Sequence, residues 1–330
     1  MIGKTIFRLG VTAAVVLCLA ASVSAAVEAK GLPKGLAGIT GPFDFAAPRT
    51  PGIREYVQDT FLIHMNTKGR RTSTESLILR LRCVPSELRG KPGDEYTCLE
   101  FKMVKKDGKT VTIPALAGWT YVFTSGSGED EKGQVFGIPH AKFEGLVDSD
   151  GVPLDVEHGY FVYNSFIDFH GFDDAFARPI PGGHGIQDLK VPGQSIIHAA
   201  ANTQPPVNLG KGIKEGSYFR NGEAKLTFKG LGLADDRACA VIGFDSGEST
   251  LKMIMPTASG AEIVTEGGSE YIGDLYIDLE TRWVRKIALD EFVISETELP
   301  KAAEFGPMSG TKIQGYTVRH LLTRLVGKEN

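Results

Sequence analysis

The sequence has no long block of basic residues. It carries 36 lysines and arginines against 40 aspartates and glutamates, for a net charge of −4. The densest basic group, Lys68-Gly69-Arg70-Arg71, is short and lies between two strand-like runs, as a solvated turn would. A mildly acidic chain of this kind has no electrostatic means to hold nucleic acid or anionic lipid. We therefore expect no nucleic-acid partner.

Motifs that would carry catalysis or hold a cofactor are also missing. The chain contains no H-x-H, H-E-x-x-H or C-x-x-C pair. Ser246 stands one place away from the position that a G-x-S-x-G nucleophile elbow requires. The glycine-rich run Gly210–Gly216 lacks the Lys-Ser/Thr ending of a phosphate-binding loop. We expect no cofactor, and we favour a protein that is not an enzyme.

Long hydrophobic runs are absent after the N-terminus. Lys4 and Arg8 precede the apolar run Leu9–Val23, which ends in the small residues Ser24 and Ala25. This pattern predicts a secretory signal peptide over residues 1–25. Its removal leaves a net charge of −6 and no segment that could span a membrane. The mature chain is therefore expected to be secreted, either periplasmic or extracellular.

Cysteine is scarce, and three cysteines remain after that cleavage: Cys83, Cys98 and Cys239. Cys83 closes one apolar run and Cys98 opens another, with prolines and a glycine between them. Because export permits disulfides, we predict a Cys83–Cys98 bridge across a surface loop, worth about 3 kcal/mol. Cys239 lies in a dense apolar run and is expected to be a buried free thiol.

What the sequence has in abundance is alternation of apolar and polar residues. Leu275, Ile277 and Leu279 alternate with polar residues, and Ile287 and Leu289 do the same after a short polar connection. Apolar spacing of two, with β-branched and aromatic residues, predicts a β-hairpin over Tyr271–Leu279 and Trp283–Ile294. Similar runs extend through the stretch Ser217–Ile294.

The same alternation recurs elsewhere and sets the predicted fold class. We predict a mainly β protein of antiparallel sheets, in the style of a sandwich or an open half-barrel, with few short helices. Two sheet units and one large curved sheet both fit. Further strands are expected at Glu55–Met65, Ser76–Cys83, Leu99–Lys106, Lys109–Pro114, Trp119–Thr124, Ala141–Val147 and Thr311–Val326.

Composition divides the chain after the signal peptide. The prolines and glycines of residues 178–216 predict either a linker or a long loop over one sheet. The expected segments are an extended lead-in at 26–52, an N-terminal β unit at 53–177, a connector at 178–216, and a C-terminal β unit at 217–330.

The aromatic run Tyr160–Phe169 is the first candidate binding element. We interpret it as a strand that is apolar on both faces, with Phe161, Tyr163 and Ile167 on one of them. Such a face either belongs to the core or lines a site for an apolar ligand or a partner.

A window of histidines is the second candidate. His158, His170, His184 and His198 lie near Asp173 and Asp174. Imidazole and carboxylate serve both metal binding and acid–base hydrolysis. Spacings of twelve and fourteen place no two of these histidines on one local element. His158, His170, Asp173 and His184 are therefore weak metal candidates, and exposed loop histidines are the plainer interpretation.

Three functional hypotheses follow. The chain is similar in general style to envelope carrier proteins whose open half-barrel holds a lipid or a lipoprotein, a resemblance of fold alone. The first hypothesis is therefore a non-enzymatic exported protein that binds an apolar small molecule or an envelope protein. The alternatives are a hydrolase that uses His158, His170 and His184, and a structural or assembly module of the cell envelope that presents sheet edges.

Overall fold

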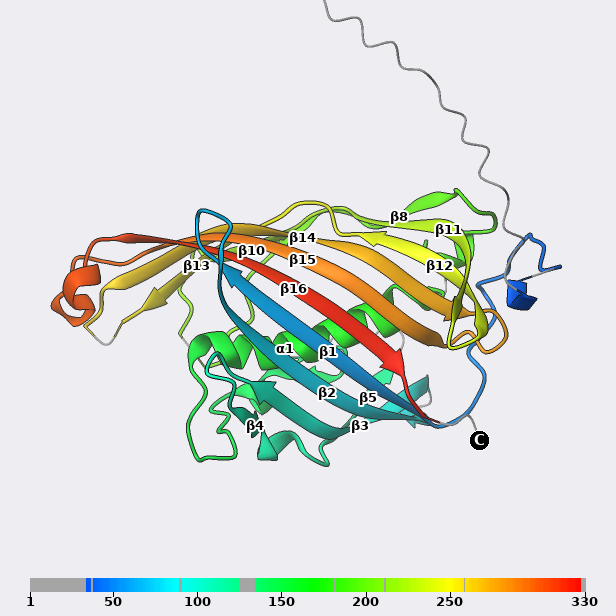
Figure 1. Ribbon diagram of the computed structural model, residues 1–330, viewed down its shortest axis with the longest axis horizontal. Coiled ribbons are helices and arrows are strands. Elements are labelled where there is room, and N and C mark those ends of the chain that lie inside the picture. Colours follow the sequence, from blue (N-terminus) through cyan, green and yellow to red (C-terminus); the bar gives the residue numbers. More distant parts are fainter. Residues whose placement is uncertain are drawn as a thin grey trace, which may run out of the picture.

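A single antiparallel sheet of fourteen described strands dominates the molecule (Figure 1). The computed structural model describes residues 34–36, 38–88, 91–124, 134–180, 182–210, 212–257 and 259–327, so the predicted signal peptide lies outside the described residues. The main path of the sheet runs β4-β3-β2-β1-β16-β15-β14-β12-β11-β8. The predicted mainly β, antiparallel fold class is confirmed, in the form of one large sheet.

The N-terminal strands form one wing of the sheet, and strict alternation explains them. In β1 every second residue from Arg54 to Leu62 is buried, which places one face against the core. Asp107-Gly108 makes the expected turn after β3. The strands of this wing are β1 (Arg54–Met65), β2 (Arg71–Leu88), β3 (Lys91–Val104), β4 (Thr110–Thr112) and β5 (Thr120–Thr124).

The C-terminal strands form the other wing, and β16 joins the two by pairing with β1 along Tyr56–Met65. The predicted hairpin is confirmed, because β14 and β15 pair from Val264 to Ile277. The strands of this wing are β10 (Tyr218–Asn221), β11 (Ala224–Ala234), β12 (Arg237–Asp245), β13 (Ser249–Pro256), β14 (Glu262–Asp278), β15 (Val284–Glu298) and β16 (Lys312–Leu325).

The segment 178–216 lies along one edge of this sheet. Its strands β8 (Ser195–Ala199) and β9 (Asn202–Gln204) pair with β11 and β10. The two-residue strands β6 (Gln134–Val135) and β7 (Ile138–Pro139) pair with each other and do not belong to the main sheet. The short 3₁₀ turns are η1 (Lys34–Leu36), η2 (Pro114–Leu116), η3 (His140–Phe143), η5 (Ile186–Asp188) and η6 (Ala303–Met308).

Two strand predictions between β5 and β8 are wrong. Ala141–Val147 forms η3 and a loop. The aromatic run forms the helix α1 (Val156–His170), which continues as the π-helical turn η4 (Gly171–Ala175). The Asp155 side chain accepts the His158 backbone N–H and caps the helix. Among the described residues, no helix combines the length and the hydropathy needed to cross a membrane.

The helix lies across one face of the sheet, here called the inner face (Figure 1). Val162, Phe166 and Phe169 recur at helical spacing and are fully buried. Phe166 stacks on Phe101 of β3, and Phe169 packs edge-on against Tyr56 of β1. Loop residues cover the helix from the other side, where Tyr160 donates to the Val207 carbonyl. Because α1 is buried on several sides, its apolar residues do not fall on one helical face, and their spacing does not distinguish a helix from a strand.

A buried arginine of β16 ties the last turn of α1 to the inner face. Arg319 forms ion pairs with Asp168 of α1 and Glu291 of β15. The Tyr271 hydroxyl lies 2.7 Å from an Arg319 nitrogen and 3.1 Å from Asp168 Oδ1. All three charged residues are at least nine-tenths buried. This arrangement, here called the Arg319 triad, fixes the helix against the C-terminal wing.

The predicted disulfide is wrong: Cys83 and Cys98 are buried free thiols. No surface loop separates them, because β2 and β3 continue as a long hairpin between the two positions. In that hairpin Cys83 pairs with Tyr96, and Cys98 pairs with Leu81. The two cysteines are therefore diagonal neighbours, farther apart than a disulfide allows. Cys239 is a buried free thiol as expected, and burial raises its pKa to about 12.

Candidate functional site

The structure does not bring the predicted histidines together. His158 lies in the first turn of α1 and His170 ends it, so the expectation that no two of these histidines share one element is wrong, but the two are about 18 Å apart at the rise of an α-helix. His184 is an exposed loop residue that pairs with Asp188, and His198 lies on the edge strand β8. Among the described residues, no group of histidine, cysteine and carboxylate side chains is arranged to hold a metal ion.

The three aromatic and aliphatic candidates do not share one face. Phe161 is half-buried beside His158, and Ile167 is half-buried farther along α1. Tyr163 is buried and packs edge-on against Phe143 of η3. A helix turns Phe161 and Tyr163 to different sides, so the single strand face expected from the sequence is wrong.

A cluster of imidazoles and carboxylates holds the start of α1. Glu75 of β2 is 3% exposed, and its two oxygens lie 2.9 Å from His158 Nε2 and 3.0 Å from His64 Nε2. Asp155 lies 2.8 Å from His158 Nδ1. The hydrogen bond to Glu75 raises the pKa of His158 to about 9, and Asp155 adds to the shift. His158 is therefore a cation at neutral pH and a clamp between helix and sheet.

Because His158 holds the helix on the sheet as a cation, we expect the free energy of unfolding to fall in mild alkali. The folded pKa of His158, about 9, exceeds its unfolded value of 6.5, so its contribution is complete below pH 6.5 and is lost as pH rises through 9. Because Asp155 is exposed to water, we expect a loss of about 1–2 kcal/mol in the free energy of unfolding. In urea titrations at pH 6 and pH 9.5, the wild type should lose more stability than His158→Gln, which lacks the contribution of the imidazolium. The exposed His184→Gln should behave as the wild type, and an equal loss in all three would contradict the clamp.

The far end of α1 holds a second, deeper arrangement, here called the buried ionic centre. Arg49 comes from the extended segment before β1 and donates to Asp173 Oδ2 at 3.1 Å and to Asp174 Oδ1 at 3.2 Å. Arg178 pairs with both Asp174 and Asp94 of β3. The full set is Arg49, Asp94, Tyr96, His170, Asp173, Asp174 and Arg178.

The pKa values of the two aspartates of this centre are shifted in opposite directions. Burial raises the pKa of Asp173, and the charge of Asp174 adds to that shift. Burial also acts on Asp174, but Arg178, His170 and Arg49 outweigh it and hold the pKa of Asp174 well below its usual value. Asp173 Oδ1 has no hydrogen-bond partner among the described residues, so Arg49 contacts this carboxyl through Oδ2 alone.

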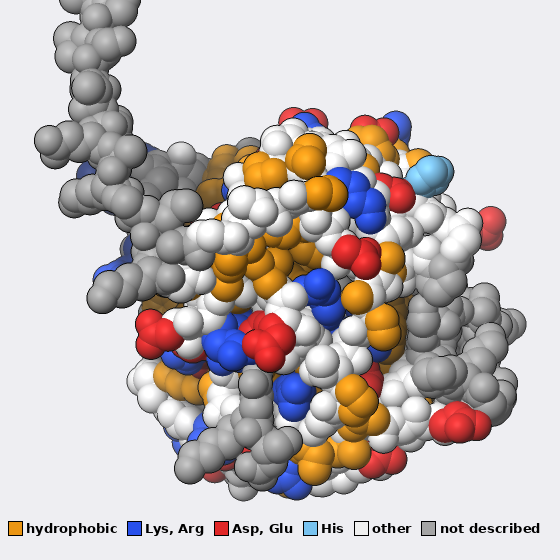
Figure 2. Space-filling view, turned by 90° about the vertical axis from the view of Figure 1, so that its right-hand side faces the viewer, with side chains coloured by type: hydrophobic (Ala, Val, Ile, Leu, Met, Phe, Trp, Pro, Cys, Tyr) orange, Lys and Arg blue, Asp and Glu red, His pale blue; other side chains and the backbone are white. Residues whose placement is uncertain are grey.

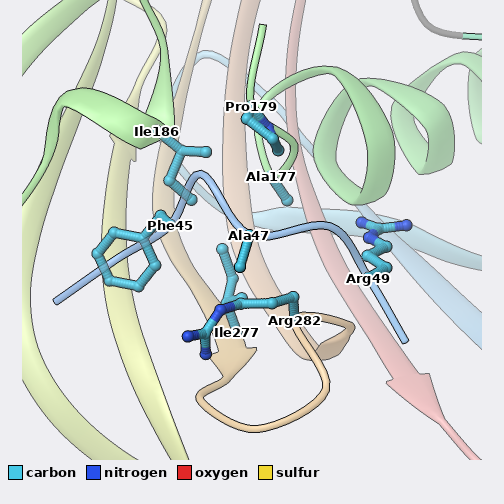
Figure 3. Close-up of a pocket in the computed structure, with 8 residues that line it drawn as sticks. All are labelled: Phe45, Ala47, Arg49, Ala177, Pro179, Ile186, Ile277 and Arg282. Atoms are coloured by element: carbon cyan, nitrogen blue, oxygen red, sulfur yellow. The ribbon is translucent and has the colours of Figure 1, made fainter.

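A very small pocket adjoins Arg49. Its volume is about 10 Å³, which is room for one water molecule. Figure 3 shows the segment that bears Phe45, Ala47 and Arg49 passing between Ile186 on one side and Ile277 and Arg282 on the other. A space of this size cannot admit a lipid or a substrate.

Tyr121, His170 and Asp174 form a hydrogen-bonded chain that has the order of a catalytic triad. Tyr121 Oη lies 2.6 Å from His170 Nε2, and His170 Nδ1 lies 2.7 Å from Asp174 Oδ2. Burial, however, raises the pKa of Tyr121 well above normal, which makes the phenol a poor nucleophile. Aromatic rings surround His170, which is 0% exposed. These hydrogen bonds therefore hold the C-terminal end of α1 in place.

The opposite, outer face of the sheet carries a group of hydrophobic side chains that are exposed or half-buried. They form two cross-strand rows, with Ile63, Val318 and Phe292 in register, and Met65, Tyr316 and Ile294 beside them. Phe292 is 49% exposed and Ile294 58%, although both are large and apolar. We define the outer apolar patch as Phe61, Ile63, Met65, Phe292, Ile294, Tyr316 and Val318.

The patch runs into a groove of about 580 Å³ over β13, β14, β15 and β16. Phe292, Ile294 and Tyr316 belong to both. The rest of the lining includes the glycines Gly267 and Gly268 and the glutamates Glu248, Glu266, Glu270 and Glu296. We call this feature the acidic groove. Its volume is within the range of sites that bind small molecules and peptide side chains.

Other parts of the surface mix their charges. The end of the molecule seen in Figure 2 shows basic and acidic side chains next to one another around a recess with hydrophobic side chains. Such mixing produces little field of one sign. The acidic groove differs because its lining contains four carboxylates and no basic side chain.

Neither the buried ionic centre nor the outer apolar patch was predicted from the sequence. Arg49 and Asp174 are 125 residues apart, so no local spacing could pair them. The patch depends on the register of β1, β16 and β15, which the sequence alone leaves open. A usable signal was present in β15, where Phe292 and Ile294 have the parity opposite to that of the buried Ile287 and Leu289.

Comparisons with known proteins supply no family. No protein-family model matches the chain, and no curated protein is similar to it in sequence. One solved structure that aligns with the chain is a Bacteroides fragilis protein described as exported and as having a YmcC-like fold. It is 11% identical, the alignment covers 86% of this chain and 97% of the other, and the TM-score is 0.20. At this TM-score the likeness carries no argument about the present chain.

Proposed function

We propose that this chain is an exported, non-enzymatic binding protein that docks an envelope protein on the outer apolar patch. The observation that carries the proposal is the exposure of Phe292 and Ile294, at 49% and 58%, in register with other hydrophobic side chains. Contiguous exposed apolar surface of this kind marks interaction sites. The N-terminal leader supports export.

A protein partner fits better than an apolar small molecule held inside the sheet. The inner face is packed by α1, with Phe166 and Phe169 0% exposed. The pocket beside Arg49 holds about 10 Å³. The patch and the groove are open on the outer face, as a surface for another polypeptide would be. The edge strands β4, β5, β8 and β9 have three, five, five and three residues, which leaves little for strand addition at these edges.

Site-specific cross-linking tests this proposal in the native envelope. A photoreactive phenylalanine analogue placed at position 292 should form a defined adduct with an envelope protein, which mass spectrometry then identifies. The matched control is position 191, because Val191 is 50% exposed but lies outside the patch. Adding Ile294→Asn should lower the adduct yield about tenfold, since central contacts dominate interfaces. It should leave stability nearly unchanged.

Each outcome decides the proposal. An envelope protein captured at 292 and not at 191, and sensitive to Ile294→Asn, supports it. Adducts with lipid alone, adducts with a second copy of this chain alone, equal adducts at both positions, or no adduct would each contradict it.

A further inference from the structure

The floor of the acidic groove is built from backbone that no side chain can cover. Gly268 pairs with Ile294 on one side and with Thr250 on the other. A Cβ at Gly268 would lie 2.7 Å from the Ser249 carbonyl oxygen, and one at Gly267 would lie 2.4 Å from the Ile294 carbonyl oxygen. Both positions therefore require glycine, and Gly268, which is in register with Ile294 on the outer face, leaves β14 open between the side chains of β13 and β15.

The glutamates around this floor are only partly neutralised. Lys252 lies 2.9 Å from Glu266, and Lys312 lies 2.6 Å from Glu296, both at the surface. Glu248 and Glu270 have no cationic partner among the described residues. Glu270 is directly in register with Phe292 on β15. Two uncompensated carboxylates thus lie next to the exposed hydrophobic side chains of the patch.

Hydrophobic surface beside uncompensated negative charge selects one kind of occupant. Anionic lipid and nucleic acid would be repelled, and a neutral apolar molecule would gain nothing from the glutamates. A lysine or arginine side chain offers an aliphatic stem for Ile294 and a cation for Glu270. It could also lie over the Tyr316 ring in a cation–π contact.

We propose that the acidic groove binds an extended polypeptide segment in which lysine or arginine alternates with hydrophobic residues. Its hydrophobic side chains lie on Phe292 and Ile294, and its cations pair with Glu248 and Glu270. This inference rests on the proposed docking function and names the chemistry of the partner segment. Charge complementarity steers the encounter and rejects wrong partners, while the hydrophobic contacts hold the complex.

Fluorescence anisotropy with three labelled eight-residue peptides tests the inference on the full chain. One peptide alternates lysine with leucine or phenylalanine, the second replaces lysine by glutamate, and the third replaces the hydrophobic residues by serine. The first should bind at least tenfold more tightly than the other two. The double variant Glu248→Gln/Glu270→Gln should weaken that binding about fivefold and reduce its dependence on salt, as for two exposed ion pairs.

The matched control removes two carboxylates elsewhere, with Glu87→Gln on β2 and Glu144→Gln after η3. Both residues are exposed and lie outside the groove. An equal loss of affinity in both double variants would overturn the inference, as would equal binding of the lysine and glutamate peptides. Neither result touches the cross-linking test at position 292, so the patch can hold a partner even if the charge preference is absent. A cross-link to an acidic partner segment would also overturn the inference.

Discussion

Replacing Asp174 with alanine is expected to lower the free energy of unfolding by about 3–5 kcal/mol, because it removes the buried carboxylate that Arg49, Arg178 and His170 share. Arg178, Arg49, His170 and Tyr96 all contact this carboxylate, which is 0% exposed. Urea titration at pH 7 should show a lower midpoint with an unchanged slope. The π-helical turn that carries Asp174 has no other carboxylate that could replace it, since Asp173 is held by Arg49.

Two control variants make this expectation specific. Asp173→Asn should cost much less, about 1 kcal/mol or below, because burial already disfavours the charged form of Asp173. Asp188→Ala should cost about 1 kcal/mol or less, because its carboxylate pairs with the 89% exposed His184 and accepts one backbone N–H, from Gly185. If Asp174→Ala lost no more than Asp173→Asn, the two arginines would have to be stabilised by something other than Asp174.

The sheet was predictable because its strands obey a local rule. Leu275 and Ile277 of β14, and Ile287 and Leu289 of β15, alternate with polar residues because one face is buried and the other meets water. The turn at Asp107-Gly108 is equally local. The helix was not predictable in this way, because Tyr163 packs on η3 while Phe166 packs on β3. With apolar residues on both of these sides, no continuous polar face indicates a helix. The signal that could have found it was Asp155 before the run, a preferred N-cap.

The sites were less predictable, because they depend on pairs that are distant in the chain. The histidine window contained His170, Asp173 and Asp174, yet the cations that neutralise the two aspartates include Arg49 from the extended lead-in. The hydrophobic side chains of the patch come from β1, β15 and β16. Sequence can indicate that β15 is apolar on both faces, but only the register of β1 and β16 turns its outer residues into a continuous surface.

Replacing Arg319 with methionine should have an effect as large as that of Asp174→Ala, and it should depend on pH. The change leaves Asp168 and Glu291 at least nine-tenths buried without their cation. At pH 8 we expect a loss of about 3–5 kcal/mol in the free energy of unfolding. Burial already raises the pKa of Asp168 while Arg319 is present, and removal of the cation raises it further, so the variant gains stability as pH falls. The loss at pH 5 should therefore be about 1–2 kcal/mol smaller than at pH 8.

Further substitutions separate charge from packing in the Arg319 triad. Adding Asp168→Asn and Glu291→Gln to Arg319→Met removes the uncompensated charges and should abolish the difference between pH 5 and pH 8. Arg319→Lys keeps a cation but cannot reach both carboxylates with one planar group, so it should fall between the wild type and Arg319→Met. If Arg319→Met lost the same free energy of unfolding at both pH values, water would have to reach the carboxylates. The ion pair would then not be needed to keep α1 packed on the sheet.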